Sequence, residues 1–283
     1  MFEMKSLENG FEYVEVKNSV ASAKIALQGA HIFSFKRSDE ELLWLSSESP
    51  FERGTAIRGG IPLCWPRFGN IDKSLPQHGF ARTFLFEFVK VVEKSDILTV
   101  VHMQLKSSQE SRKIWNFDFA LDIFFHVTDT LKIEMKTSNK DVKEFLLTQA
   151  FHTYFPVSDI GDVVISGLDG KKYLDSLTGK EECQKGNIFI DREVDRIYKE
   201  SAEHITLSDK EHEVNIEAKN SNSVIVWNPS IDKCAKMSGM QKEAYKEFVC
   251  IESANALDDF KVVPPNESVS LCVKYDFRYT SII

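Results

Sequence analysis

Apolar and polar residues alternate along most of this 283-residue chain, and this period-two pattern limits the folds that the chain can adopt. Successive side chains of a β-strand point to opposite faces, so the alternation gathers apolar residues on one face of each strand. Burial on one side only is typical of antiparallel sheets. The pattern is clearest over residues 21–27, 97–105, 117–125, 131–135 and 269–277. We therefore predict an all-β fold, a large antiparallel β-sandwich.

Turn signals and the scarcity of helical patterns agree with this prediction. Pairs such as Asn9-Gly10 and Asp169-Gly170 are typical of the turns that join strands. Helical periodicity is rare, and only residues 232–248 are compatible with a short helix, which Gly239 interrupts. No internal repeat or linker is visible, so we expect residues 1–283 to form a single domain.

The charge balance of the chain bears on its partners. With 35 Lys and Arg against 43 Asp and Glu, the formal net charge is −8. A protein that binds nucleic acid needs a basic face to neutralise phosphates, and the sequence shows none. We therefore expect no nucleic-acid partner, and any anionic ligand must be held by a few local cations.

Cysteine usage and hydropathy indicate the compartment. Five scattered cysteines without a CxxC pair argue against a disulfide framework and against a zinc site. The first 16 residues lack a basic stretch followed by an apolar run, and no apolar run approaches the roughly 18 residues that a membrane span needs. We expect a monomeric cytoplasmic protein with no membrane partner.

Residues 54–82 break the alternation and are rich in Gly and Pro, which predicts structured loops on a rigid scaffold. Their notable polar side chains are, in chain order, Arg58, Arg67, Gln77, His78 and Arg82. Guanidinium groups in a Gly-rich bend suit an anion such as phosphate. The alternative is that these arginines form surface ion pairs with some of the many carboxylates.

Residues 145–155 read as a strand that carries one histidine. On such a strand His152 lies with Thr148 and Tyr154 on the face opposite Phe151. An imidazole, with an ordinary pKa of about 6.5, suits general acid catalysis at neutral pH. The alternative is a structural histidine.

Two carboxylates are further candidates. Glu252 ends an apolar run, so it is either a buried general base with a raised pKa or the point where the strand emerges into water. Asp195 belongs to the charge run 191–198, which is typical of a solvated loop, although its carboxylate is also suited to accepting hydrogen bonds from sugar hydroxyls.

The motifs GxGxxG, GxxxxGK[ST], HExxH and GxSxG are absent, so nothing in the sequence indicates a nucleotide, a metal or a serine nucleophile. The segments RGGIPLCWPRFG, QHGFAR, FHTYF, DRIY, WNP and ESAN, in this order, instead resemble the glucose-6-phosphate 1-epimerases, or hexose-6-phosphate mutarotases, of the aldose-1-epimerase-like group. The resemblance extends from about Arg58 to Asn255. It implies a galactose mutarotase-like β-sandwich with the sugar site on a concave sheet face.

The resemblance also implies roles for individual residues. His152 of FHTYF becomes the general acid and Glu252 of ESAN the general base. The substrate, a hexose 6-phosphate, would be bound by Arg58, Gln77, His78, Arg82 and Asp195. Arg67 in CWPRFG departs from the family pattern. The implied reaction interconverts the α and β anomers and requires no cofactor.

The chemistry agrees with these roles, because opening a hemiacetal needs one base for the C1 hydroxyl and one acid for the ring oxygen. Three alternatives stay open: a mutarotase for free aldoses, a non-catalytic module that binds sugar phosphates, and a glycosidase that uses Glu252 and Asp195 as its two carboxylates.

Overall fold

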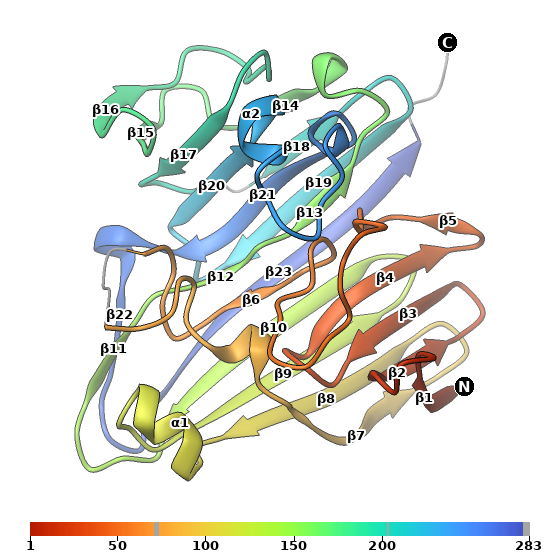
Figure 1. Ribbon diagram of the computed structural model, residues 1–283, viewed down its shortest axis with the longest axis vertical. Helices are drawn as coiled ribbons and strands as arrows, with labels where there is room; N and C mark the ends of the chain where they lie inside the picture. Colours follow the sequence, from red (N-terminus) through yellow and green to blue (C-terminus); the bar gives the residue numbers. More distant parts are fainter. Residues whose placement is uncertain (71–73, 203, 280–283) are drawn as a thin grey trace.

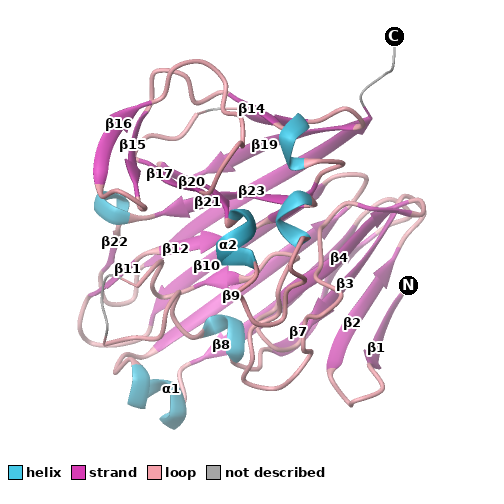
Figure 2. Ribbon diagram, turned by 45° about the horizontal axis from the view of Figure 1, so that its top comes forward, coloured by secondary structure: helices cyan, strands magenta, loops and turns pink. Residues whose placement is uncertain are grey.

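The computed structural model describes residues 1–70, 74–202 and 204–279, and Figure 1 shows a molecule built mainly of long strands. The described strands pair antiparallel within sheets, as the alternation predicts. This confirms the all-β, antiparallel fold class. Figure 2 shows that the helices are few and short.

One eight-stranded sheet forms the back of the molecule in Figure 1. Its strands, in spatial order, are β14 (Val164–Ser166), β18 (Ile205–Ser208), β19 (His212–Lys219), β23 (Ser268–Tyr279), β10 (Leu131–Asn139), β9 (Phe119–Val127), β8 (Thr99–Lys106) and β7 (Glu87–Lys94).

A second eight-stranded sheet lies in front of the first and carries the segments singled out above. Its strands are β16 (Lys180–Cys183), β15 (Lys172–Asp175), β17 (Val194–Tyr198), β20 (Ser223–Asn228), β21 (Phe248–Asn255), β12 (Gln149–Phe151) and β6 (Leu63–Cys64), with β13 (Tyr154–Pro156) also paired to β21.

Smaller elements complete the fold. A five-stranded sheet contains β1 (Phe2–Ser6), β2 (Glu12–Lys17), β3 (Ala21–Ala26), β4 (His31–Arg37) and β5 (Glu40–Glu41), and a two-stranded sheet contains β11 (Phe145–Leu147) and β22 (Lys261–Val263). The helices are α1 (Gln109–Ile114) and α2 (Ser230–Cys234), with 3-10 turns at Ala81–Thr83, Ile160–Asp162, Ala244–Lys246 and Leu257–Asp259.

A common hydrophobic core joins the three large sheets. Ile133 and Val273 of the back sheet are fully buried in the same cluster as Phe151 and Val249 of the front sheet and Ile25 of the five-stranded sheet. Because alternate residues face this core, the other face of the front sheet is left for the remaining side chains of β12, β20 and β21. The functional candidates lie on that face.

The predicted helix is only partly correct. The helix α2 begins two residues earlier than predicted and ends at Cys234, and a 3-10 turn follows at Ala244–Lys246. Gly239 lies between them with φ +72, a left-handed conformation that stops a right-handed helix. The sequence pattern also missed α1, which Ser108 begins with a capping box to Ser111.

The start of the second predicted strand also differs, because β8 begins at Thr99 and Ile97 is exposed in the preceding turn. Among the described residues, no helix is long and apolar enough to cross a membrane.

Candidate active site

His152 and Glu252 are neighbours across two strands of the front sheet. Phe151 of β12 pairs with Ser253 of the antiparallel strand β21. His152 follows Phe151 and Glu252 precedes Ser253, so the two candidates lie opposite each other in the same register. Cross-strand neighbours have side chains within contact distance, however far apart they lie in the sequence. Nε2 of His152 is 3.5 Å from Oε1 of Glu252. The topology thus brings an imidazole and a carboxylate together.

The local fold around His152 differs from the predicted single strand. Residues 145–155 form parts of β11, β12 and β13, and His152 lies in the break before β13. In this break the backbone N–H of His152 donates to the carbonyl of Pro62, and that of Tyr154 to the carbonyl of Gly60. The predicted face is confirmed, since Phe151 packs into the core and His152 lines the cavity on the other side.

Glu252 is a buried residue and does not mark the emergence of its strand into water. The strand β21 continues to Asn255, all eight of its residues are buried, and Glu252 is 2% exposed. Burial raises the pKa of the Glu252 carboxyl well above its ordinary value, and the nearby Asp195 adds to this. Burial lowers the pKa of His152 well below its ordinary value, with His78 and Arg82 adding to the effect.

Each member of this pair also has a buried polar atom without a hydrogen-bond partner among the described residues. These atoms are Nδ1 of His152 and Oε2 of Glu252. Buried polar atoms are normally paired, because leaving one unpaired costs about 1–3 kcal/mol. Both residues line a cavity, where a ligand with hydroxyl groups can supply the missing partners.

This cavity has a volume of about 300 Å³. Its walls include all seven residues to which the resemblance assigns a role: Arg58, Gln77, His78, Arg82, His152, Asp195 and Glu252. Tyr154 and Trp227 also line it. The imidazole of His152 stacks on Tyr154, with ring centroids 4.9 Å apart, and lies edge-on to Trp227 at 5.7 Å. These aromatic contacts fix the plane of the imidazole.

The two arginines that are candidates for binding an anion each donate a hydrogen bond to a backbone carbonyl. Nε–H of Arg58 donates to the carbonyl of Ser238 at 3.3 Å, and Nη2–H of Arg82 donates to the carbonyl of Gln77 at 2.7 Å. Both arginines are half-buried, and both line the cavity that contains His152. Their remaining N–H groups can serve a planar or tetrahedral oxyanion.

The backbone beside Arg58 requires glycine. Gly59 has φ +110, and a Cβ there would lie 2.5 Å from both the Cα of Leu45 and the carbonyl oxygen of Trp44. We expect Gly59→Ala to lower the free energy of unfolding by at least about 1–3 kcal/mol, measured by urea denaturation. Gly54→Ala is the matched control, because Gly54 has φ +80 but no neighbour within 4 Å. Equal losses in both variants would contradict the packing argument.

His78 is a neutral hydrogen-bond donor at the cavity wall. Burial, helped by Arg82 and Arg58, lowers the pKa of His78 to about 3. Nδ1 accepts a hydrogen bond from the backbone N–H of Gly69 at 3.3 Å and lies 3.3 Å from Sγ of Cys64. The proton of the neutral ring is therefore on Nε2, from which it can be donated to a hydroxyl.

Asp195 of β17 and Lys233 of α2 also line the cavity. Burial raises the pKa of Asp195. Nζ of Lys233 lies 3.9 Å from Oδ2 of Asp195, 2.8 Å from Oε1 of Glu193, and over the ring of Trp227. Lys233 is not among the residues predicted from the sequence, although it lies four residues after the WNP segment.

Comparison with known proteins identifies the family. Residues 12–276 match the family model "Aldose 1-epimerase". The chain belongs to the aldose 1-epimerase family. It is 36% identical over 258 residues to the "Putative glucose-6-phosphate 1-epimerase" of Escherichia coli (strain K12), a match that covers 89% of this chain and 85% of that protein.

Solved structures agree with this assignment. The "putative mutarotase (YeaD)" of Salmonella typhimurium superposes with a TM-score of 0.92 at 31% identity, covering 99% of this chain and 94% of the other. A galactose mutarotase related enzyme of Lactobacillus acidophilus has a TM-score of 0.75 at 17% identity, covering 95% and 97%, which shows a shared fold. The resemblance inferred from the motifs is confirmed, and the chain is an epimerase that interconverts sugar anomers.

The described part of this epimerase contains no group of three or more His, Cys, Asp or Glu side chains placed to hold a metal ion.

The burial of Glu252 in the epimerase leads to a prediction of how the free energy of unfolding depends on pH. Above a pH of about 4.5 the unfolded chain releases a proton that the folded chain keeps on Glu252, so the free energy of unfolding falls as the pH rises. Glu252→Gln removes this contribution. We expect the variant to gain stability relative to the parent protein by up to about 1.4 kcal/mol per pH unit between pH 5 and 7, measured by urea denaturation.

The exposed position Glu8 provides the control, since Glu8→Gln removes the same charge from the surface. A stability difference for Glu252→Gln that does not change with pH would contradict the proposed burial of the carboxyl proton.

Proposed function

We propose that this epimerase interconverts the α and β anomers of glucose 6-phosphate or a related hexose 6-phosphate, with Glu252 and His152 as the base and acid. The observation that carries the proposal is the His152–Glu252 pair in a cavity that also contains Arg58 and Arg82. The Escherichia coli relative is named for the same substrate, glucose 6-phosphate.

The reaction is a reversible ring opening. Glu252 takes the proton of the C1 hydroxyl while His152 gives a proton to the ring oxygen, and the C1–O5 bond breaks to form the open aldehyde. Rotation about the C1–C2 bond exposes the other face of the aldehyde. Ring closure then reverses both proton transfers, so the two groups exchange roles.

The protonation state of the pair is part of the proposal. Burial favours neutral His152 and protonated Glu252, because it raises the pKa of the carboxyl and lowers that of the imidazole. The reactive form has the same net charge and differs only by the transfer of one proton from Glu252 to His152. Such a transfer requires no exchange of protons with water.

A bound phosphate favours this transfer. The positive charges of Arg82 and Arg58 contribute to lowering the pKa of His152. A phosphate held between the two guanidinium groups cancels this repulsion and so favours the imidazolium. It also fixes the sugar far from the reacting carbon, which converts binding energy into orientation. Lys233 adds a third cation to the same cavity.

The ring hydroxyls are assigned to the remaining wall residues. Neutral His78 donates from Nε2, and Asp195 accepts, which is the complementary pair that hydroxyl groups need. Gln77 is exposed beside His78, and its side-chain amide can donate or accept a hydrogen bond. The three residues would therefore orient the ring above His152 and Glu252.

Exchange NMR on equilibrated anomers tests the proposal directly. We expect faster exchange for glucose 6-phosphate than for glucose at equal enzyme concentration. Equal turnover of both sugars would favour the mutarotase for free aldoses, and no acceleration with either would favour a binding module. Hydrolysis of a glucoside without anomer exchange would favour a glycosidase.

A monomeric state, a cytoplasmic location and a single-domain organisation are predictions that complete the proposal. Size-exclusion chromatography with light scattering tests the first of these.

A further inference from the structure

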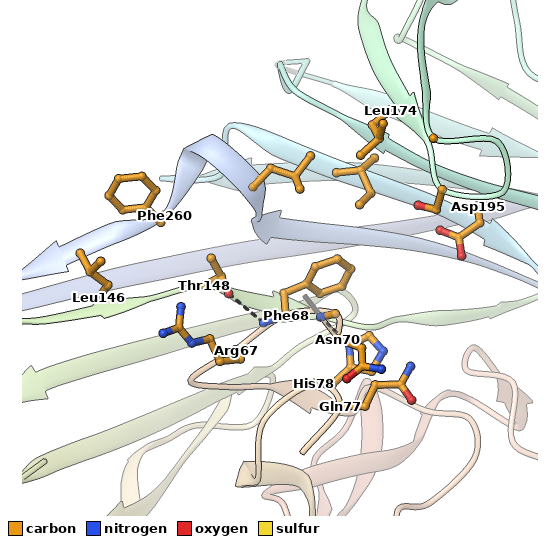
Figure 3. Close-up of a pocket in the computed structure, with 15 residues that line it drawn as sticks. Arg67, Phe68, Asn70, Gln77, His78, Leu146, Thr148, Leu174, Asp195 and Phe260 are labelled. Atoms are coloured by element: carbon orange, nitrogen blue, oxygen red, sulfur yellow. Dashed lines mark hydrogen bonds between the residues drawn. The ribbon is translucent and has the colours of Figure 1, made fainter. Parts of the chain in front are cut away.

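A second cavity, of about 550 Å³, adjoins the catalytic cavity (Figure 3). The two share four wall residues: Phe68, Gln77, His78 and Asp195. In Figure 3, Asp195 lies on the upper side of the opening, and Gln77 and His78 lie on the loop below it. The shared residues make the second cavity an extension of the sugar site. The catalytic cavity of about 300 Å³ is already at the small end of the range for ligand sites, so the extension offers room beyond one monosaccharide.

The walls of the extension suit a sugar ring. Phe68 and Phe260 offer aromatic surfaces, and Phe260 is 47% exposed. Asn70, Thr148 and Ser176 add hydrogen-bonding groups among the apolar ones. Aromatic faces pack against the C–H face of a sugar, and scattered amide and hydroxyl groups serve its rim.

The aromatic residue Phe68 is held in place through a hydrogen bond of its own backbone N–H. Oγ1 of Thr148 accepts a hydrogen bond from the backbone N–H of Phe68 at 2.8 Å, drawn as a dashed line in Figure 3. The ring of Phe68 packs edge-on against His78, with centroids 5.2 Å apart. Phe68 therefore forms a fixed boundary between the extension and the catalytic cavity.

The position of the extension relative to the sugar follows from the proposed function. Arg58, Arg82, His152 and Glu252 line the catalytic cavity but not the extension. The phosphate on C6, the C1 hydroxyl and the ring oxygen are thus on the far side of the shared residues. The hydroxyls on C2, C3 and C4 face Gln77, His78 and Asp195, and these hydroxyls lead into the extension.

We propose that the extension binds a glycosyl group carried on O2, O3 or O4 of the substrate, so that the enzyme also anomerises phosphorylated disaccharides at their reducing end. The C1 hydroxyl must stay free, because its proton is removed in the reaction. A sugar that carries a glycosyl group on O1 is therefore excluded as a substrate. This inference rests on the proposed function.

The test uses a panel of glucose 6-phosphates that carry a glucosyl group on O2, O3 or O4, with anomer exchange followed by NMR. We expect at least one member to exchange with a kcat/KM within about tenfold of that of glucose 6-phosphate. If glucose 6-phosphate is accelerated and no member of the panel is, the extension is not a glycosyl site. If glucose 6-phosphate itself is not accelerated, the proposed function fails first, and the two failures are distinguishable.

Substitution of an aromatic wall residue identifies the binding surface. Phe260→Ala is expected to lower kcat/KM for the accepted disaccharide by about 2–10-fold, the usual contribution of an aromatic contact, and to leave that for glucose 6-phosphate unchanged. Phe189→Ala is the matched control, because Phe189 is 61% exposed and lines neither cavity. Equal effects of the two variants on the disaccharide would overturn the assignment of the extension.

Discussion

Replacing Glu252 with glutamine is expected to lower kcat for anomer exchange of glucose 6-phosphate by about 10²–10⁴-fold. The amide is nearly isosteric with the carboxyl but cannot accept the proton of the C1 hydroxyl. Because Glu252 is buried and its raised pKa favours the neutral carboxyl, the variant should fold and bind substrate with little change in affinity. Exchange NMR measures kcat, and isothermal titration measures the affinity.

The neighbouring Cys250 supplies the control for this variant. It lies two residues before Glu252 on the same strand, is fully buried, and lines neither cavity. Cys250→Ala therefore tests whether any change in this strand lowers activity. Full activity of Glu252→Gln, or an equal loss in Cys250→Ala, would contradict the role of the carboxylate.

His152→Ala is expected to cause a loss of similar size, since an acid and a base that act on one bond work as a unit. The double variant should then be scarcely slower than either single variant. Multiplication of the two losses would mean that His152 and Glu252 act independently.

Much of the fold followed from local sequence patterns. Alternation identified the strands because a half-buried sheet forces it, and the face of His152 followed from its parity with Tyr154. Glu252 was left with two interpretations, because the residues from Phe248 to Asn255 do not reveal whether a further layer covers the strand. Burial depends on residues that are distant in the chain, and no local pattern contains them.

The site itself was harder to predict than its members. Motif order suggested which side chains matter, but the 3.5 Å approach of His152 to Glu252 depends on the pairing of β12 with β21. Lys233 was not predicted as a site residue, because the position of the short helix α2 over the sheet is set by tertiary contacts. The backbone N–H of His152 likewise finds its partner far away in the chain, at the loop carbonyl of Pro62.

The arginines should determine the preference for a phosphorylated substrate. We expect Arg58→Ala and Arg82→Ala each to raise KM for glucose 6-phosphate by about 10–100-fold, the usual loss when one hydrogen-bonding partner of a charged group is removed. The rate with glucose should not fall, because a free sugar has no anion for the arginines to bind and because loss of either arginine also removes a positive charge that lowers the pKa of His152. Steady-state exchange measurements with both sugars, at low and high salt, test this.

Controls separate a lost anion contact from a displaced loop. Arg53→Ala is the matched variant, because Arg53 belongs to the same loop region but is exposed, pairs with Glu12 at 3.5 Å and does not line the catalytic cavity. Since Arg82 also holds the carbonyl of Gln77, a shifted loop would slow glucose as well as glucose 6-phosphate. Arg82→Lys keeps the charge but loses the planar fork, and an intermediate KM is expected. An unchanged KM in both alanine variants would place the phosphate elsewhere and leave a free aldose as the better substrate.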